Sequence, residues 1–143
     1  MTVKAILDRK DYDIATIAPT ADLASAVKLL AARRIGALVV TGSEREVAGI
    51  ISERDIIRVL AEAGAAALEQ PVGQVMTRKV VTCTRADTMS NIMELMTAGK
   101  FRHLPVVEGD QLIGIISIGD VVKYRVQQIE FESAALRDYI STA

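Results

Sequence analysis

Apolar residues recur at helical spacing in two segments that lie 66 positions apart in the chain. The first set is Leu23, Ala26, Val27 and Leu30, and the second set is Met89, Ile92, Met93 and Met96. This i, i+3, i+4, i+7 spacing predicts a helix with one apolar face in each segment. Asp22 and Thr88 stand just before these helices, where a side-chain oxygen can accept a hydrogen bond from a free amide. We therefore predict that both are N-caps.

The same offset superimposes two short apolar runs, 35–40 and 101–106, which predict strands buried on both faces of a sheet. A hairpin turn follows each run, and the turn is one residue longer in the first copy. Beyond the turns, residues 47–55 match residues 112–120. Agreement on both sides of a one-residue insertion indicates that one unit occurs twice in the chain.

Each copy is predicted to contain a lead-in turn, at 3–10 and at 72–79, followed by the order β-α-β-β-α. The fold class is therefore α/β, of the α+β type, with two pseudo-symmetric units. A segment rich in Ala and Glu, 61–69, is interrupted by Gly64 and links the copies. The predicted parts are a first unit, a second unit and a C-terminal helix extension, at 1–66, 67–126 and 127–143. One unit cannot cover both faces of its small sheet, so we expect the copies to pack together as a single folding unit.

The chain from Val121 to Ile140 contains neither Gly nor Pro, which predicts one long helix. Within it, residues recur at alternating spacings of four and three, a heptad-like stripe typical of a helix that packs on another helix. The stripe is Val122, Val126, Ile129, Ser133, Leu136 and Ile140. We expect the helix's own module to cover part of the stripe. Its length beyond residue 129 predicts a partner chain, most simply a second copy.

The element order, the strand at 101–107 and two Gly-x-x-Ser-x-x-Asp segments, 49–55 and 114–120, resemble a tandem pair of CBS domains. This family is named after cystathionine β-synthase. The resemblance covers about residues 3–126 and points to the stand-alone, bacterial-type signalling members. In the family, paired units form two clefts that often bind AMP, ADP, ATP, NAD or S-adenosylmethionine. The resemblance thus implies a regulatory module that binds an adenine nucleotide.

Each Ser-x-x-Asp segment, Ser52 to Asp55 and Ser117 to Asp120, allows two interpretations. As a capping box, the Ser accepts a hydrogen bond from a helix amide and the Asp accepts one from the Ser amide. As a ligand site, Asp55 and Asp120 accept hydrogen bonds from ribose hydroxyls while the helix N-terminus attracts phosphate. The two roles can coexist, and the resemblance favours ribose recognition by at least one Asp.

Arg102 and His103 precede the second unit's strand, and the simplest interpretation is a solvated pair beside Lys100. The resemblance instead implies that both contact phosphate, which a guanidinium binds well. The first unit has Gly36 and Ala37 at these positions but offers Arg54 in its helix start, so we predict unequal clefts. Whether Arg102 and His103 share a cleft with Asp55 or with Asp120 stays open.

Thr16 and Thr82 fall in the predicted first strand of each copy, and the resemblance implies that this strand lines the adenine pocket. Cys83 follows Thr82 and is the only cysteine, so no intramolecular disulfide is possible. We predict a buried, inert thiol there; a redox switch would require a stabilised thiolate.

Composition narrows the classes of function. The chain has 17 basic and 18 acidic residues, a net charge of −1, and only 3% aromatic residues. Nucleic-acid binding is therefore not expected, because there is no overall attraction to phosphate and few rings for base stacking. No apolar run approaches the ~18 residues of a membrane span. The segment from Met1 to Lys10 carries four charges, so we expect a soluble cytoplasmic protein without membrane contact.

The leading functional hypothesis is a sensor that binds AMP, ADP, ATP or NAD between its units and signals through a homodimer to an unidentified client protein. The alternative is a structural dimerisation scaffold with vestigial clefts. An enzyme is not expected, because the sequence contains no P-loop and no nucleophile paired with its single histidine. That single histidine also argues against a His-based metal site, and we predict no obligatory cofactor.

Overall fold

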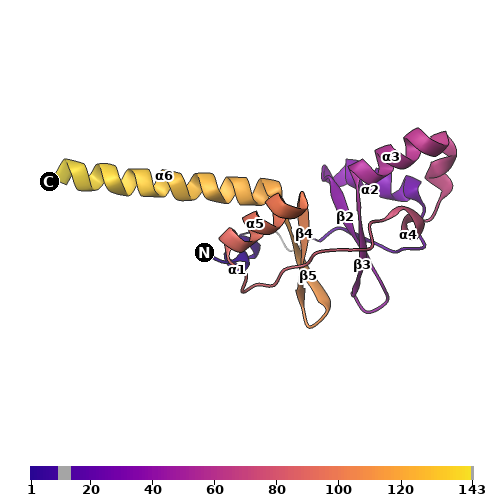
Figure 1. The fold of residues 1–143 in the computed structure, drawn as a ribbon, viewed down its shortest axis with the longest axis horizontal. Helices are drawn as coiled ribbons and strands as arrows, with labels where there is room; N and C mark the ends of the chain where they lie inside the picture. The colour runs from indigo at the N-terminus through magenta and orange to yellow at the C-terminus, as the bar shows by residue number, and fades with distance from the viewer. Residues whose placement is uncertain (10–13, 143) are drawn as a thin grey trace.

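A computed structural model describes residues 1–9 and 14–142 of the chain. Lys10, which ends the first predicted lead-in, and Ala143, which ends the predicted extension, lie outside the described residues. The helices are α1 (Val3–Leu7), α2 (Leu23–Arg33), α3 (Glu53–Ala63), the 3-10 helix η1 (Gly64–Glu69), α4 (Val72–Val75), α5 (Met89–Gly99) and α6 (Ile118–Thr142). The strands are β1 (Thr16–Ile17), β2 (Ala37–Thr41), β3 (Val47–Ser52), β4 (His103–Glu108) and β5 (Gln111–Ser117). Figure 1 shows the two units side by side, with α6 projecting from one of them.

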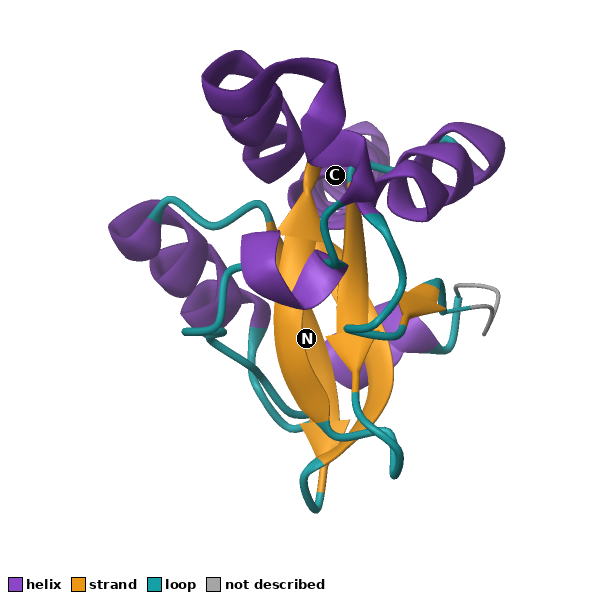
Figure 2. Cartoon of the chain, turned by 90° about the vertical axis from the view of Figure 1, so that its right-hand side faces the viewer, coloured by secondary structure: helices purple, strands orange, loops and turns teal. Residues whose placement is uncertain are grey.

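The strands form two small sheets, and the helices lie around them (Figure 2). In the first sheet β1 pairs parallel with β2, and β2 pairs antiparallel with β3. In the second sheet β4 and β5 form an antiparallel pair. The last pair before the first turn is Thr41 with Val47, which encloses five residues, whereas Val107 with Leu112 encloses four. The one-residue difference between the hairpins is therefore confirmed.

The predicted first strand of the second copy is wrong, because only Cys83 pairs there. Cys83 forms an isolated parallel bridge with Val106, in which its amide donates to the Pro105 carbonyl at 3.0 Å. The next hydrogen bond of a parallel ladder would run from the Pro105 amide to the Val81 carbonyl. Proline has no amide hydrogen, so the ladder stops, and Thr82 lies outside any strand.

Both predicted N-caps are confirmed. The Asp22 side chain accepts a hydrogen bond from the Ser25 amide at 2.9 Å, and the Thr88 hydroxyl accepts one from the Asn91 amide at 3.2 Å. The apolar faces differ from the prediction at one position. Val27 and its counterpart Met93 are 37% and 41% exposed, whereas the other three apolar residues of each face are buried.

The hydrophobic residues gather in two cores, and the lead-in helices are exchanged between them. The first core contains residues from β1 to β3, α2 and α3 together with Val72 and Val75 of α4. The second core contains residues of α5, β4, β5 and α6 together with Val3, Ile6 and Leu7 of α1. Helix α4, in the second lead-in, thus packs on the first unit, and α1, in the first lead-in, packs on the second unit. The unit boundaries at 1–66 and 67–126 follow the repeat in sequence and stay a prediction.

Helix α6 confirms the predicted long helix and begins directly after β5. The expectation that its own module covers part of the heptad stripe is wrong. The module buries Val121 and Tyr124 instead, while Val122 and Val126 are 56% and 47% exposed. From Ile129 to Thr142 every residue is exposed, and this part of α6 extends away from both units (Figure 1).

Candidate functional site

The two Ser-x-x-Asp segments start α3 and α6, and both form the predicted capping box. In the first, the Asp55 amide donates to Ser52 Oγ at 3.4 Å and the Ser52 amide donates to Asp55 Oδ2 at 2.9 Å. In the second, the Asp120 amide donates to Ser117 Oγ at 3.1 Å and the Ser117 amide donates to Asp120 Oδ2 at 2.8 Å. The capping interpretation is therefore confirmed for both segments, and the ribose-binding role stays a prediction.

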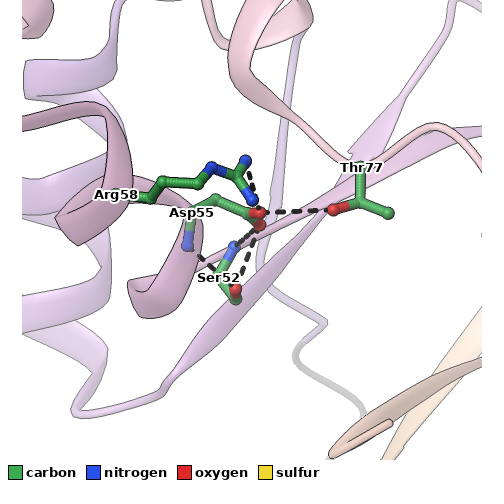
Figure 3. Close-up of polar contacts among 4 residues, drawn as sticks. All are labelled: Ser52, Asp55, Arg58 and Thr77. Carbon is green, nitrogen blue, oxygen red and sulfur yellow. Dashed lines mark hydrogen bonds and ion pairs between the residues drawn. The ribbon is translucent and has the colours of Figure 1, made fainter. Parts of the chain in front are cut away.

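Asp55 is 6% exposed and accepts hydrogen bonds on both carboxylate oxygens (Figure 3). Oδ2 accepts from the Ser52 amide and, at 3.0 Å, from the Ser52 hydroxyl. Oδ1 accepts from the Arg58 guanidinium at 3.3 Å and from the Thr77 hydroxyl at 3.2 Å. The buried charge is thus compensated by donors from the end of β3, from α3 and from the segment after α4.

A cleft of about 650 Å³ lies between the two units and contains six of the predicted site residues. They are Ser52, Arg54, Asp55, Arg102, His103 and Ser117. The rest of the lining is Gly36, Ala37, Ile50, Glu53, Ile57, Arg58, Thr77, Lys100, Phe101, Ile118 and Gly119. Cleft volumes of this size are typical of small-molecule sites.

Equivalent backbone hydrogen bonds hold the two walls in place. In the first unit the Glu53 amide donates to the Gly36 carbonyl at 3.0 Å, and in the second the Ile118 amide donates to the Arg102 carbonyl at 2.8 Å. Each bond ties the start of a helix to the start of a strand. The walls also approach each other, because a Cβ atom at Gly36 would lie 3.6 Å from His103 Cε1.

This arrangement answers the question that the sequence left open, because Arg102 and His103 share a cleft with Asp55. Asp120 does not line this cleft, although its partner Ser117 does. Thr16 and Thr82 do not line it either, and both are exposed. The apolar part of the wall is instead Ile50, Ile57, Phe101 and Ile118.

The cleft carries excess positive charge although the whole chain is slightly acidic. Its lining includes four cationic side chains, Arg54, Arg58, Lys100 and Arg102, against two carboxylates, Glu53 and Asp55. The N-termini of α3 and α6 also meet there, and each adds partial positive charge. Such a site attracts an anion, and its apolar wall suits a ring.

Two residues of this site, Arg58 and Thr77, were not predicted from the sequence. Arg58 lies three positions after Asp55 in α3, and that acid–base spacing on a helix was the available signal. Thr77 reaches Asp55 from 22 positions away. It belongs to the second lead-in, whose packing on the first unit could not be read from the repeat.

Cys83 is 2% exposed and lies outside the cleft. Burial, with a smaller contribution from the Asp87 carboxylate, raises the pKa of its thiol to about 12. The thiol is therefore protonated at neutral pH, as expected for an inert buried cysteine. Across residues 1–9 and 14–142, no group of three or more potential metal ligands occurs, and no helix is long and apolar enough to cross a membrane.

Comparison with known proteins gives consistent matches. The family model of the CBS domain matches twice, at residues 3–62 and 72–127. A mitochondrial CBS domain-containing protein of Arabidopsis thaliana, CBSX3, is 39% identical over 119 residues. That alignment covers 80% of this chain and 58% of the plant protein, so the chain spans little more than half of that relative.

Solved structures show the same fold. The crystal structure of a CBS-domain containing protein from Agrobacterium tumefaciens is 48% identical, with a TM-score of 0.83, and the alignment covers 87% of this chain and 99% of that one. The crystal structure of CBSX2 in complex with AMP is 24% identical, with a TM-score of 0.72, and the alignment covers 85% and 96% of the two chains.

Proposed function

Because the chain belongs to the CBS domain family and carries the domain as a tandem pair, we propose that it is a regulatory module that binds an adenine nucleotide, AMP, ADP, ATP or NAD, between its two units. The observation that carries this proposal is the cleft, in which cations and helix N-termini of both units surround two carboxylates and an apolar wall. The AMP complex of a protein with the same fold supports the class of ligand.

Each part of the ligand has a counterpart in the lining. Arg102 and Arg54 stand on opposite walls and offer guanidinium groups to phosphate, and His103 lies beside them. Phe101 and Ile50 offer an apolar surface to the adenine ring. Asp55 offers its carboxylate to the ribose.

A ribose hydroxyl can bind Asp55 only if it displaces a hydrogen-bond donor that is already present. The four hydrogen bonds that Asp55 accepts fill the usual capacity of a carboxylate. A ribose hydroxyl that binds Asp55 therefore replaces a donor. Thr77 is the neutral donor at Oδ1, and we propose that the ribose hydroxyl takes its place.

A ligand that contacts both units fixes their relative position, which is how occupancy would be transmitted. We propose that the module transmits it as part of a homodimer in the cytoplasm, to a client protein, and that it performs no catalytic step itself. Binding must also raise the apparent stability, by about 2.7 kcal/mol at a ligand concentration one hundred times Kd.

Calorimetric titration and thermal unfolding with AMP, ADP, ATP, NAD and S-adenosylmethionine test the proposal. We expect at least one adenine nucleotide to bind. Arg102→Ala should lower the affinity for that nucleotide roughly tenfold, because a charged hydrogen bond is lost. Arg85→Ala is the matched control, because Arg85 is exposed and does not line the cleft. If none of these ligands produces binding heat or thermal stabilisation at millimolar concentration, the sensing function is ruled out.

The alternative function is a dimerisation scaffold whose cleft is vestigial, and the exposed stripe of α6 favours it. Arg102→Ala separates the two functions better than substitution of Asp55 or Asp120. Both aspartates cap helices, so their loss would also affect folding. Full cellular activity of Arg102→Ala at a nucleotide concentration where its weakened binding leaves the cleft largely empty would favour the scaffold.

A further inference from the structure

The C-terminal half of α6 has no covering surface among the described residues. All residues from Ile129 to Thr142 are exposed, and they include Leu136, Tyr139 and Ile140 at 59%, 72% and 66%. A helical segment of this length is marginal in water without tertiary packing. It also lies beyond residue 127, where the match to the CBS domain ends. A stable helix here therefore requires a partner surface that the two CBS units do not supply.

The heptad stripe lies on a face of α6 that is separate from the face that packs on the module. In heptad notation Val122, Ile129 and Leu136 take position d, and Val126, Ser133 and Ile140 take position a. The five apolar residues of this set are 47% to 66% exposed. Buried Tyr124 takes position f, on the opposite side of the helix. A second helix can therefore approach the stripe without meeting the helix's own module.

The charges that flank the stripe suit a second copy of the same helix. Arg125 and Glu132 take position g, while Glu130 and Arg137 take position e. In a parallel pair, position g of one helix faces the e position that follows in the other. Arg125 then faces the partner's Glu130, and Glu132 faces the partner's Arg137. Symmetry repeats both contacts, so every one of these charges meets an opposite charge.

An antiparallel pair that buries the whole stripe is disfavoured by the same charges. It pairs position e with e and position g with g, which brings Glu130 against the partner's Glu130 and Glu132 against the partner's Glu132. It also brings Lys123 against the partner's Arg137. Like charges in such contact disfavour a pairing.

A shorter antiparallel pairing, with Val126 against the partner's Ile129, does match opposite charges. It places Leu136 opposite the partner's Gly119, however, and carries Ile140 past the start of the partner's helix at Ile118. Only the parallel arrangement buries all five apolar residues and also pairs the charges.

We propose that α6 pairs in parallel and in register with α6 of a second copy, through Val122, Val126, Ile129, Leu136 and Ile140. The inference rests on the homodimer of the proposed function and is independent of nucleotide binding. It adds a direction to that homodimer, because both modules then lie at the same end of the paired helices.

Cysteine cross-linking of Leu136→Cys tests the direction. In the parallel pair the two introduced thiols are neighbours, and mild oxidation should convert most of the protein to a disulfide-linked dimer. In the two antiparallel pairings the same residues are ten and seventeen positions apart, or roughly 15 and 25 Å. Phe131→Cys is the control, because Phe131 is 76% exposed but takes position f on the outer side. It should not cross-link, and the native Cys83 is buried in both variants.

Charge reversal followed by sedimentation of the full chain tests the register. Arg125→Glu should weaken self-association roughly tenfold, and adding Glu130→Arg should restore it. Both residues are exposed, so these changes leave the module's core intact. A monomer at high micromolar concentration, or a dimer in which Leu136→Cys fails to cross-link, would overturn the inference. Nucleotide titration of the same samples separates the two proposals, since lost ligand binding with efficient cross-linking contradicts only the sensing function.

Discussion

The Thr77 hydroxyl donates a hydrogen bond of 3.2 Å to Asp55 Oδ1, which joins the segment after α4 to the cap of α3. Next to it, the Thr77 amide donates to the Ile50 carbonyl at 2.8 Å and the Ile50 amide donates to the Thr77 carbonyl at 3.0 Å. These contacts hold the second lead-in on the first unit. They also place a neutral side chain at the carboxylate to which we assign the ribose.

Replacing Thr77 by valine should lower the free energy of unfolding by about 1 kcal/mol, because one hydrogen bond to a carboxylate is lost while the shape is kept. Urea denaturation measures the change. Thr82→Val is the control, since Thr82 is exposed and lies outside the cleft. Equal stability of Thr77→Val and the wild type would show that the hydrogen bond contributes nothing.

Asp22 should make the stability depend on pH. Hydrogen bonds from the Ser25 side chain and amide lower its pKa below the ordinary value of 3.8. A lowered pKa contributes stability above the unfolded value, and this contribution is lost as the pH falls through the folded value. The stability advantage of wild type over Asp22→Asn should therefore be full at pH 7 and vanish in strong acid. A difference that persists unchanged below pH ~2 would contradict the assignment.

Cys83 should react slowly with thiol reagents at pH 8 in the folded protein, because its pKa of about 12 leaves almost no thiolate and its side chain is buried. Thr84→Cys, exposed one position later, should react at the rate of a free thiol in the same assay. The raised pKa also predicts that this group's contribution to stability falls as the pH rises from 9.0 toward 12. Rapid labelling of Cys83 in native protein would reopen the redox hypothesis.

Tyr124 and Phe131 separate the two faces of α6. Tyr124→Ala should cost about 3 kcal/mol of stability, because Tyr124 is 6% exposed and packs in the second core. Phe131→Ala should change the stability of a dilute sample by less than about 0.5 kcal/mol. Thermal or urea unfolding of both variants measures the contrast. Similar losses for the two would mean that α6 packs on its module along a different face.

Features that depend on neighbouring residues could be predicted from the sequence. The caps at Asp22 and Thr88, the capping boxes and the longer first hairpin all follow from residues a few positions apart, whose geometry is local. The absence of a strand at Thr82 was not predicted. It depends on the register between the two segments, which places Pro105 where the ladder needs an N–H donor. The repeat predicted the same first strand in both copies, but the proline at position 105 prevents that strand from continuing in the second copy.

The cleft was only partly predictable. The residue types at Arg54, Asp55 and Arg102 indicated a nucleotide site, yet their assembly into one cleft depends on how the two units face each other. The same holds for Thr77, which reaches the site through long-range packing. The exposed stripe of α6 was visible as a pattern. Which face the module covers was not, because Val121 and Val122 are adjacent and equally apolar.

The exchanged lead-in helices have a consequence for synthesis on the ribosome. The first core is a continuous stretch of chain that ends with α4, so it can close while translation is still in progress. The second core needs α1, which emerges first, together with β5 and Tyr124, which emerge near the end. Between these moments Val3, Ile6 and Leu7 have no surface to cover them. A nascent chain halted after the first unit would therefore expose the apolar residues of α1, to which a chaperone could bind.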